Sequence, residues 1–177
     1  MGDHINKSAS DPKQFDIISI GELLIDFVGT DDVPGAEANS YAETYQANPG
    51  GAPANVVCTA QKLGLETAFI GAVGQDHFGR LLTHVLENEG VNTDGITAVD
   101  DAFTTLAFVS LDEDANRSFS FSRKPGADTC LRLNKVQEDI IQATRVLHFG
   151  TLSLTDEPAR SSTMRAVEQA KAQGSIV

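Results

Sequence analysis

Apolar residues recur along the chain with two periods, and the alternation of these periods predicts strands followed by helices. Residues 16–27 are almost continuously apolar, which is typical of a buried strand. Apolar side chains then fall at helical spacing over residues 53–63. A short apolar strand over residues 67–71 follows. The clearest amphipathic helix comes next, between an N-cap at Asp76 and a stop at Gly90.

The same rhythm returns in the last third of the chain. Asn134 is expected to cap a helix, residues 145–150 are expected to form a strand, and residues 156–174 a further helix. Residues 175–177 open another strand, and because strands usually run about five or six residues, the sequence is expected to continue. Strands and helices that alternate through short connections predict an α/β fold with a mainly parallel sheet.

Residues 103–124 depart from this rhythm. Two strand-like runs, 104–111 and 117–123, flank an acidic turn, and in the second run Phe119 and Phe121 alternate with serines. This pattern predicts an antiparallel hairpin with one polar face. The hairpin is either an ordinary edge hairpin with a packed face or an excursion that covers something outside the parallel sheet.

The stretch from Asn48 to Asn55 carries the most distinctive local chemistry. Gly50 and Gly51 allow backbone dihedrals and a close ligand approach that other residues do not. Pro53 suits the first turn of the following helix, so two glycines lead directly into a helix N-terminus. Free backbone N–H groups, the helix dipole and the Asn55 amide can there bind a hydroxyl-rich or anionic ligand. The alternative is a tight loop before a helix, without a ligand.

Asp26 stands within the first apolar run. A carboxylate in such a stretch is costly unless it is paired or faces a cleft. Ligands of α/β sheets bind beyond the carboxyl ends of the strands, where Asp26 is expected to lie. Asp26 is therefore a candidate acceptor for sugar hydroxyls. The alternative is a carboxylate that faces solvent or caps a loop.

Composition argues against several classes of function. The 177 residues suit one domain, and a net charge of −12 disfavours non-specific binding to nucleic acid or to an anionic membrane. No apolar run reaches membrane-spanning length, and residues 1–14 are expected to be a flexible polar leader, not a signal peptide. Two cysteines without metal or redox spacing fit a reducing compartment, so a cytoplasmic protein is expected. The histidines are scattered, which disfavours a zinc site, and no P-loop motif occurs.

Two groups of motifs occur in one order along the chain. The first comprises Gly50-Gly51-Ala52-Pro53-Ala54-Asn55, Lys62-Leu63-Gly64 and Val73-Gly74-Gln75-Asp76. It resembles the N-terminal signature of the ribokinase-like (PfkB) carbohydrate kinases. The second group is similar to the fructokinase branch of that family. It comprises Gly21-Glu22-Leu23-Leu24-Ile25-Asp26-Phe27, Phe121-Ser122-Arg123-Lys124-Pro125-Gly126-Ala127-Asp128 and His148-Phe149-Gly150-Thr151-Leu152-Ser153-Leu154.

This resemblance implies a Rossmann-like ribokinase fold over residues 15–177, with a small β lid above a sugar site. The lid is expected from residues 27–48 and 103–124, and a homodimer through these two segments is one expectation. The implied sugar-binding residues are Asp26, Gly50, Gly51 and Asn55 on the floor, Ala107, Val109 and Phe121 in the lid, and Arg123 as a residue able to reach the substrate.

The resemblance further implies ATP and Mg²⁺ as cofactors, and fructose to fructose 6-phosphate as the expected reaction. Members of the family carry a G-A-G-D motif whose aspartate is the catalytic base, and this sequence contains none. The chain alone is therefore expected to hold most of the sugar site, to lack the ATP site and to be inactive. Two alternatives stay open: a non-catalytic sugar-binding or protein-interaction module, and a kinase for 2-keto-3-deoxygluconate or a nucleoside.

Overall fold

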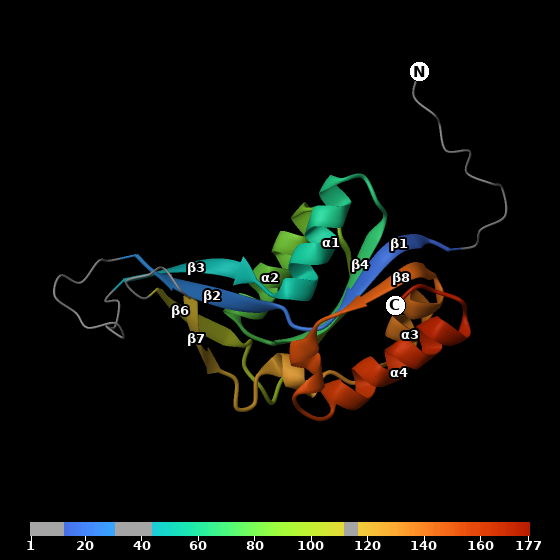
Figure 1. Cartoon of the computed structure of the whole chain (residues 1–177). Helices are drawn as coiled ribbons and strands as arrows, with labels where there is room; N and C mark the ends of the chain where they lie inside the picture. Colours follow the sequence, from blue (N-terminus) through green and yellow to red (C-terminus); the bar gives the residue numbers. More distant parts are fainter. Residues whose placement is uncertain (1–12, 31–43, 112–116) are drawn as a thin grey trace, which may run out of the picture.

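The computed structural model describes residues 13–30, 44–111 and 117–177. They form an α/β body and a second β-sheet that projects from one side of it (Figure 1). The body is a four-stranded parallel sheet with helices on both faces. This architecture confirms the predicted α/β fold.

The elements begin with three strands and then mostly alternate. Their bounds are β1 Phe15–Ile20, β2 Leu24–Gly29, β3 Tyr45–Gly50, α1 Ala52–Lys62, β4 Thr67–Gly74, α2 His77–Asn88, β5 Asn92–Val99, β6 Leu106–Leu111, β7 Arg117–Ser122, η1 Ala127–Cys130, α3 Lys135–Gln142, β8 Thr144–Phe149, η2 Thr151–Leu154 and α4 Ala159–Ala172. Among the described helices, none combines the length and the apolar character needed to cross a membrane.

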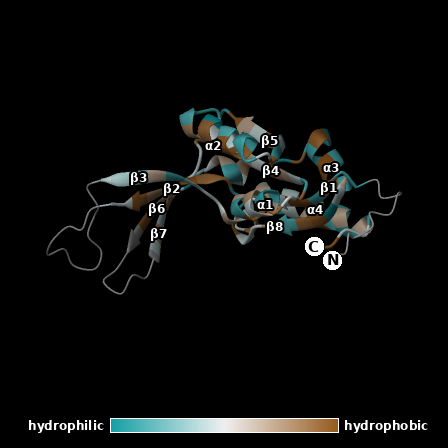
Figure 2. Ribbon diagram, turned by 90° about the horizontal axis from the view of Figure 1, so that it is seen from above, coloured by the Kyte–Doolittle hydropathy of each residue, from teal (hydrophilic) through white to brown (hydrophobic). Residues whose placement is uncertain are grey.

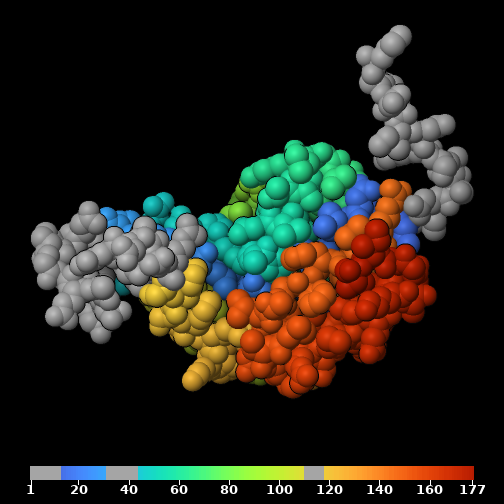
Figure 3. Space-filling model, viewed as in Figure 1, coloured from blue at the N-terminus to red at the C-terminus, as the bar shows by residue number. Residues whose placement is uncertain are grey.

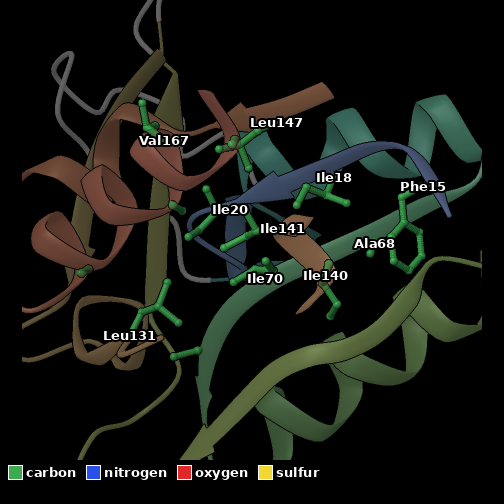
Figure 4. Packing of buried hydrophobic residues seen from close by; sticks show 14 residues of the cluster. Phe15, Ile18, Ile20, Ala68, Ile70, Leu131, Ile140, Ile141, Leu147 and Val167 are labelled. Atoms are coloured by element: carbon green, nitrogen blue, oxygen red, sulfur yellow. The ribbon is translucent and has the colours of Figure 1, made fainter. Parts of the chain in front are cut away.

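The body is organised around β1, which lies between β4 and β8 in a sheet of order β5-β4-β1-β8. Because side chains alternate across a strand, Ile18 and Ile20 of β1 face α3 and α4, whereas Phe69 of β4 faces α1 and α2. Figure 4 shows Ile141 of α3 and Val167 of α4 in the first of these two cores. Two buried faces explain why the central strands are continuously apolar.

The second sheet has the order β3-β2-β6-β7 and projects away from the α/β body (Figure 2). β2 pairs antiparallel with β3 and parallel with β6, and β6 pairs antiparallel with β7. The predicted hairpin is thus confirmed as β6 and β7, while its acidic turn lies outside the described residues. Phe27 of β2 meets Phe78 of α2 edge to face, with ring centroids 5.8 Å apart, and this contact anchors the sheet to the body.

The prediction of one strand over residues 16–27 is wrong, because the chain changes sheets in the middle of this run. Gly21 has φ of +155° and donates its N–H to Ile70 in the parallel sheet. Four residues later, Ile25 donates its N–H to Thr105, at the start of the second sheet. The turn between these residues separates β1 from β2. Asp26 therefore lies in the second sheet and not at the end of a central strand.

Two predicted helix N-caps are confirmed. Asp76 accepts hydrogen bonds from Gly79 N at 2.8 Å and from Thr104 N at 2.7 Å, so it also fixes the approach to β6. Burial would raise the pKa of Asp76, but these hydrogen bonds outweigh burial and lower the pKa. Asn134 and Gln137 form a reciprocal capping box at the start of α3.

The last residues of the chain follow the predicted course. α4 ends at Ala172, close to the expected stop at Gly174. Ile176 then forms a single parallel bridge with Val146 of β8, and its N–H donates to Arg145 O at 2.9 Å. This bridge continues the parallel sheet beyond β8, as the opening of a further strand requires.

Candidate functional site

The candidate site lies where the two sheets meet the N-terminus of α1. In the β2–β3 ladder, Asp26 is opposite Asn48, and Leu24 is opposite Gly50. A Cβ atom at Gly50 would collide with Oδ2 of Asp26 and lie 2.8 Å from its Cγ. The Asp26 carboxylate can therefore lie directly against the Gly50 backbone only because this residue is glycine.

Gly51 completes the turn and is the N-cap residue of α1. Its φ of +114° lies in a region that L-residues rarely adopt. A Cβ atom there would collide with the carbonyl oxygen of Glu22 and lie 3.1 Å from its carbonyl carbon. Each residue of the pair is thus required to be glycine for a different reason. Gly50 lies beneath Asp26, and Gly51 lies against the β1–β2 turn.

Replacing Gly51 with alanine is expected to lower the free energy of unfolding by about 2–3 kcal/mol, because the new side chain meets both backbone strain and the Glu22 carbonyl. Gly64→Ala is the matched control. Gly64 has φ of +86°, but no atom lies within 4 Å of a Cβ built there, so only strain of about 1–2 kcal/mol is expected. Urea denaturation of both variants measures the difference. Equal losses would contradict the proposed contact at Gly51.

Asn55 lies in the first turn of α1, where its N–H donates to Gly51 O at 3.0 Å. The residue is exposed. Pro53, which is buried, occupies the first turn as the sequence predicts. Asn55 therefore lies next to the glycine turn, at the surface of the molecule.

The three predicted lid residues lie on one face of the second sheet with Asp26. Across the sheet, Asp26 is opposite Ala107, and Ala107 is opposite Phe121. Val109 is opposite Phe119 in the neighbouring row. Directly opposed residues project to the same face of a sheet, so these apolar residues share the face of Asp26, with Ala107 and Val109 themselves buried. Phe119 and Phe121 stack at 6.2 Å and are both exposed.

Arg123 is engaged in a network at the base of the second sheet. Its Nε and Nη2 donate to Oδ2 of Asp128 at 2.8 and 2.7 Å, and Nη2 also donates to Leu152 O at 3.0 Å. Nη1 donates to Thr155 Oγ1 at 2.8 Å and lies 3.4 Å from Asp156. These contacts join β7 to η1 and to the turn before α4. A contact between Arg123 and a substrate stays a prediction. It would require some of these hydrogen bonds to break.

Sequence reasoning missed Glu22, which is only 3% exposed. Its Oε1 accepts a hydrogen bond from Ala52 N at 3.2 Å, whereas its buried Oε2 has no hydrogen-bond partner in the described part of the chain. Burial raises the pKa of Glu22, and the hydrogen bonds from backbone N–H groups offset only part of the rise. A lone glutamate directly after Gly21 in an apolar run was the available signal.

One hollow in the described part of the chain lies away from the candidate site. It has a volume of about 470 Å³, lies between α2 and β5 and contains none of the predicted site residues. The site itself offers a carboxylate and an amide beside a helix N-terminus, with an apolar face next to them. A few polar groups within an apolar surface can orient a small polyhydroxyl ligand and shield it from water.

Comparisons with known proteins identify relatives of this chain. The chain is 43% identical to a fructokinase from Solanum tuberosum over 162 residues, which is 91% of this chain and 50% of the relative. Fructokinase-2 from Solanum lycopersicum is also 43% identical, with 91% and 48% covered. The chain thus spans about half the length of the curated relatives it matches.

Solved structures show the same partial match. The crystal structure of a fructokinase from Xylella fastidiosa has a TM-score of 0.81 and 36% identity, covering 93% of this chain and 49% of that chain. The fructokinase from Halothermothrix orenii has a TM-score of 0.82 and 32% identity, covering 92% and 55%. The profile described as "pfkB family carbohydrate kinase" matches residues 14–177. On this match over nearly the whole sequence, the chain belongs to the pfkB family of carbohydrate kinases.

Proposed function

We propose that the protein acts in the ATP-dependent phosphorylation of fructose to fructose 6-phosphate, and that this chain supplies the sugar site. The observation that carries the proposal is the Asp26 carboxylate, placed against the Gly50 backbone where α1 begins. The names of the relatives support fructose as the sugar. We assign phosphoryl transfer to a primary hydroxyl, which is the hydroxyl that fructose 6-phosphate carries.

Each site residue then has a separate task. Asp26 accepts hydrogen bonds from sugar hydroxyls, Gly50 and Gly51 let the sugar approach the backbone, and the Asn55 amide donates or accepts. Ala107, Val109 and Phe121 close over the ring as a lid and exclude water, which limits wasteful hydrolysis of ATP. A sugar that lacks the matching hydroxyl would leave a buried polar group unpaired and would be rejected.

ATP and Mg²⁺ do not fit the helix N-terminus that this chain offers. Phosphates would meet the Glu22 carboxylate at Ala52 N and the Asp26 carboxylate at Gly50. We therefore assign nucleotide and metal binding to the G-A-G-D portion of the family, which this sequence does not contain. The chain alone is proposed to bind the sugar weakly, without transferring phosphate. A cytoplasmic location and a homodimer through the lid belong to the same proposal.

A panel of sugars tests the substrate. The complete protein, expressed from its natural gene, is assayed for ADP release with fructose, glucose, 2-keto-3-deoxygluconate and adenosine at equal concentrations. Fructose is expected to give the highest kcat/KM. A higher value for 2-keto-3-deoxygluconate or for the nucleoside would replace fructose as the substrate while keeping the kinase.

A second candidate is a non-catalytic module that binds a sugar or a protein partner. It applies if the protein in its native source also lacks a G-A-G-D motif, which these 177 residues do not contain. The intact mass of the protein purified from its native source separates the two candidates. A mass well above 18.8 kDa supports the kinase, and a mass near 18.8 kDa supports the module.

A further inference from the structure

The chain passes from the α/β body into β6 through two consecutive buried threonines. Thr104 and Thr105 are 2% and 1% exposed, and β6 begins directly after them at Leu106. The Thr104 hydroxyl donates to Oδ1 of Asp76 at 2.9 Å. The Thr105 hydroxyl donates instead to Oδ1 of Asp128 in η1. The start of β6 is thus held by carboxylates of two different segments.

Asp76 holds Thr104 through more than this one hydrogen bond. Its Oδ2 accepts Thr104 N at 2.7 Å, while its Oδ1 also caps α2 by accepting Gly79 N at 2.8 Å. The Thr104 hydroxyl in turn accepts Gly74 N, at the end of β4, at 3.0 Å. Burial raises the pKa of Asp76, but the hydrogen bonds outweigh burial and lower the pKa, so both oxygens are charged acceptors.

Two glycines give this contact its close fit. A Cβ atom at Gly74 would collide with Oδ2 of Asp76 and lie 2.6 Å from Thr104 N. A Cβ atom at Gly79 would collide with the carbonyl oxygen of Gly74 and lie 3.1 Å from Thr104 Oγ1. The end of β4, the start of α2 and the approach to β6 therefore meet around one carboxylate. We call this contact of Gly74, Asp76, Gly79 and Thr104 the Asp76 anchor.

The anchored segment leads directly to two residues of the candidate site. Thr105 O accepts the N–H of Ile25 at 3.1 Å, and Ile25 directly precedes Asp26 in β2. Ala107, which is opposite Asp26 in the second sheet, lies three residues after Thr104. At about 3.3 Å per residue along a strand, the Asp76 anchor is about 10 Å from the place where β2 and β6 bring Asp26 and Ala107 together.

The second threonine joins β6 to a different part of the body. Asp128, which accepts the Thr105 hydroxyl, also binds Arg123, and Arg123 reaches the turn before α4. In the space-filling view, the yellow surface that contains β7 adjoins the orange surface before α4 (Figure 3). The two threonines therefore tie β6 to different elements. Loss of the Asp76 anchor is expected to displace the second sheet without detaching it.

We propose that Asp76 is a positioning residue of the sugar site. Through Thr104 it sets the position of β6, and hence of Asp26 and Ala107, relative to the N-terminus of α1. The inference rests on the proposed function, which places the sugar between Asp26 and the lid. Because a displacement of about 1 Å at a reacting group can cost about a hundredfold in rate, a residue that does not touch the sugar can control its binding.

Two conservative substitutions in the complete protein, expressed from its natural gene, test this inference. Asp76→Asn can still cap α2, but separate oxygens of Asp76 accept Gly79 N and Thr104 N, and asparagine has only one oxygen. Thr104→Val keeps the branched side chain and removes the hydroxyl. Thr104→Ser keeps the hydroxyl and is the rescue variant. Asn134→Ala, which removes the N-cap of α3, is the matched control for a general loss of stability.

The measured quantities are the KM values for fructose and for ATP, from initial rates of ADP release. Asp76→Asn and Thr104→Val are each expected to raise KM for fructose about tenfold. Their KM for ATP is expected to stay within about twofold, because ATP binding is assigned to another portion of the family fold. Thr104→Ser is expected to return KM for fructose to near the wild-type value. Asn134→Ala is expected to keep both KM values, since partial unfolding lowers the amount of active enzyme and not its KM.

The outcomes separate this inference from the proposed function. If the wild-type protein phosphorylates fructose and both Asp76→Asn and Thr104→Val keep its KM for fructose, the inference is wrong and the proposed function stands. An equal rise of KM for ATP, or a Thr104→Ser variant as impaired as Thr104→Val, would also overturn the inference. If the wild-type protein does not phosphorylate fructose, both proposals fail together. Circular dichroism checks folding, and Asp76→Asn, which retains a helix cap, carries the test if Thr104→Val does not fold.

Discussion

Replacing Asp26 with alanine in the complete protein is expected to lower kcat/KM for fructose by about a thousandfold or more. The Asp26 carboxylate lies against Gly50. Across the second sheet, Asp26 is opposite Ala107, which is opposite Phe121. Without the Asp26 carboxylate, sugar hydroxyls in a shielded site lose a charged acceptor, which costs more than a neutral hydrogen bond. Initial rates of ADP release at varied fructose concentration measure the loss. Asp26→Asn, which keeps one acceptor oxygen, is expected to lose less.

Asp94→Ala is the matched control for Asp26→Ala. It removes the same charge from an exposed residue of β5 that belongs to the other sheet. Its kcat/KM for fructose is expected to stay within about twofold of the wild-type value, as is usual for exposed substitutions. Near-normal turnover in Asp26→Ala would remove Asp26 from the site. An equal loss in both variants would assign the effect to net charge.

Replacing Arg123 with alanine is expected to lower the free energy of unfolding by about 3–5 kcal/mol. The side chains of Arg123 and Asp128 are 10% and 2% exposed, so the variant leaves a buried carboxylate without its cation. Thr105 remains bonded to Asp128 at 2.5 Å but cannot neutralise it. Thermal unfolding of the chain measures the loss. For a domain of this size the melting temperature is expected to fall by about 6–20 °C.

Two further variants identify the cause of that loss. The double variant Arg123→Met with Asp128→Asn removes both charges and is expected to recover part of the stability. Lys135→Ala breaks the exposed pair between Lys135 and Asp139 within α3 and is expected to change little. If Arg123→Ala unfolds at the same temperature as Lys135→Ala, the network does not stabilise the contact of the second sheet with η1 and the turn before α4.

The sequence pattern predicted the strands and helices of the α/β body better than the place where the chain passes from one sheet to the other. Continuous apolar runs identified strands that are buried on both faces, and Asp76 and Asn134 marked helix starts through side-chain chemistry. The pattern could not show that the chain passes from one sheet to the other at Gly21, because the residues before and after it are equally apolar. β5 was missed for the opposite reason. Its first residues, including the exposed Asp94, are polar and show no clear period.

The candidate site was predictable only in part. Motifs identified Asp26 and the glycine pair, but only the β2–β3 register shows that the Asp26 carboxylate lies against Gly50. Glu22 appeared as an interruption in a strand, since its burial depends on segments more than a hundred residues apart, from Gly21 to Gly150. Arg123 was assigned by resemblance, and its partners in two later segments could not be inferred from local pattern.

The most direct test of the central claim is a titration of the ¹⁵N-labelled chain with fructose, followed by two-dimensional NMR. The account predicts saturable shifts of the amides of Gly50, Gly51, Ala52 and Asn55, which are absent with Asp26→Ala. Weak binding, with Kd in the millimolar range, is expected for a site that lacks the rest of the family fold. The account would be contradicted if saturating fructose moved none of these amides, or moved only those around the hollow between α2 and β5.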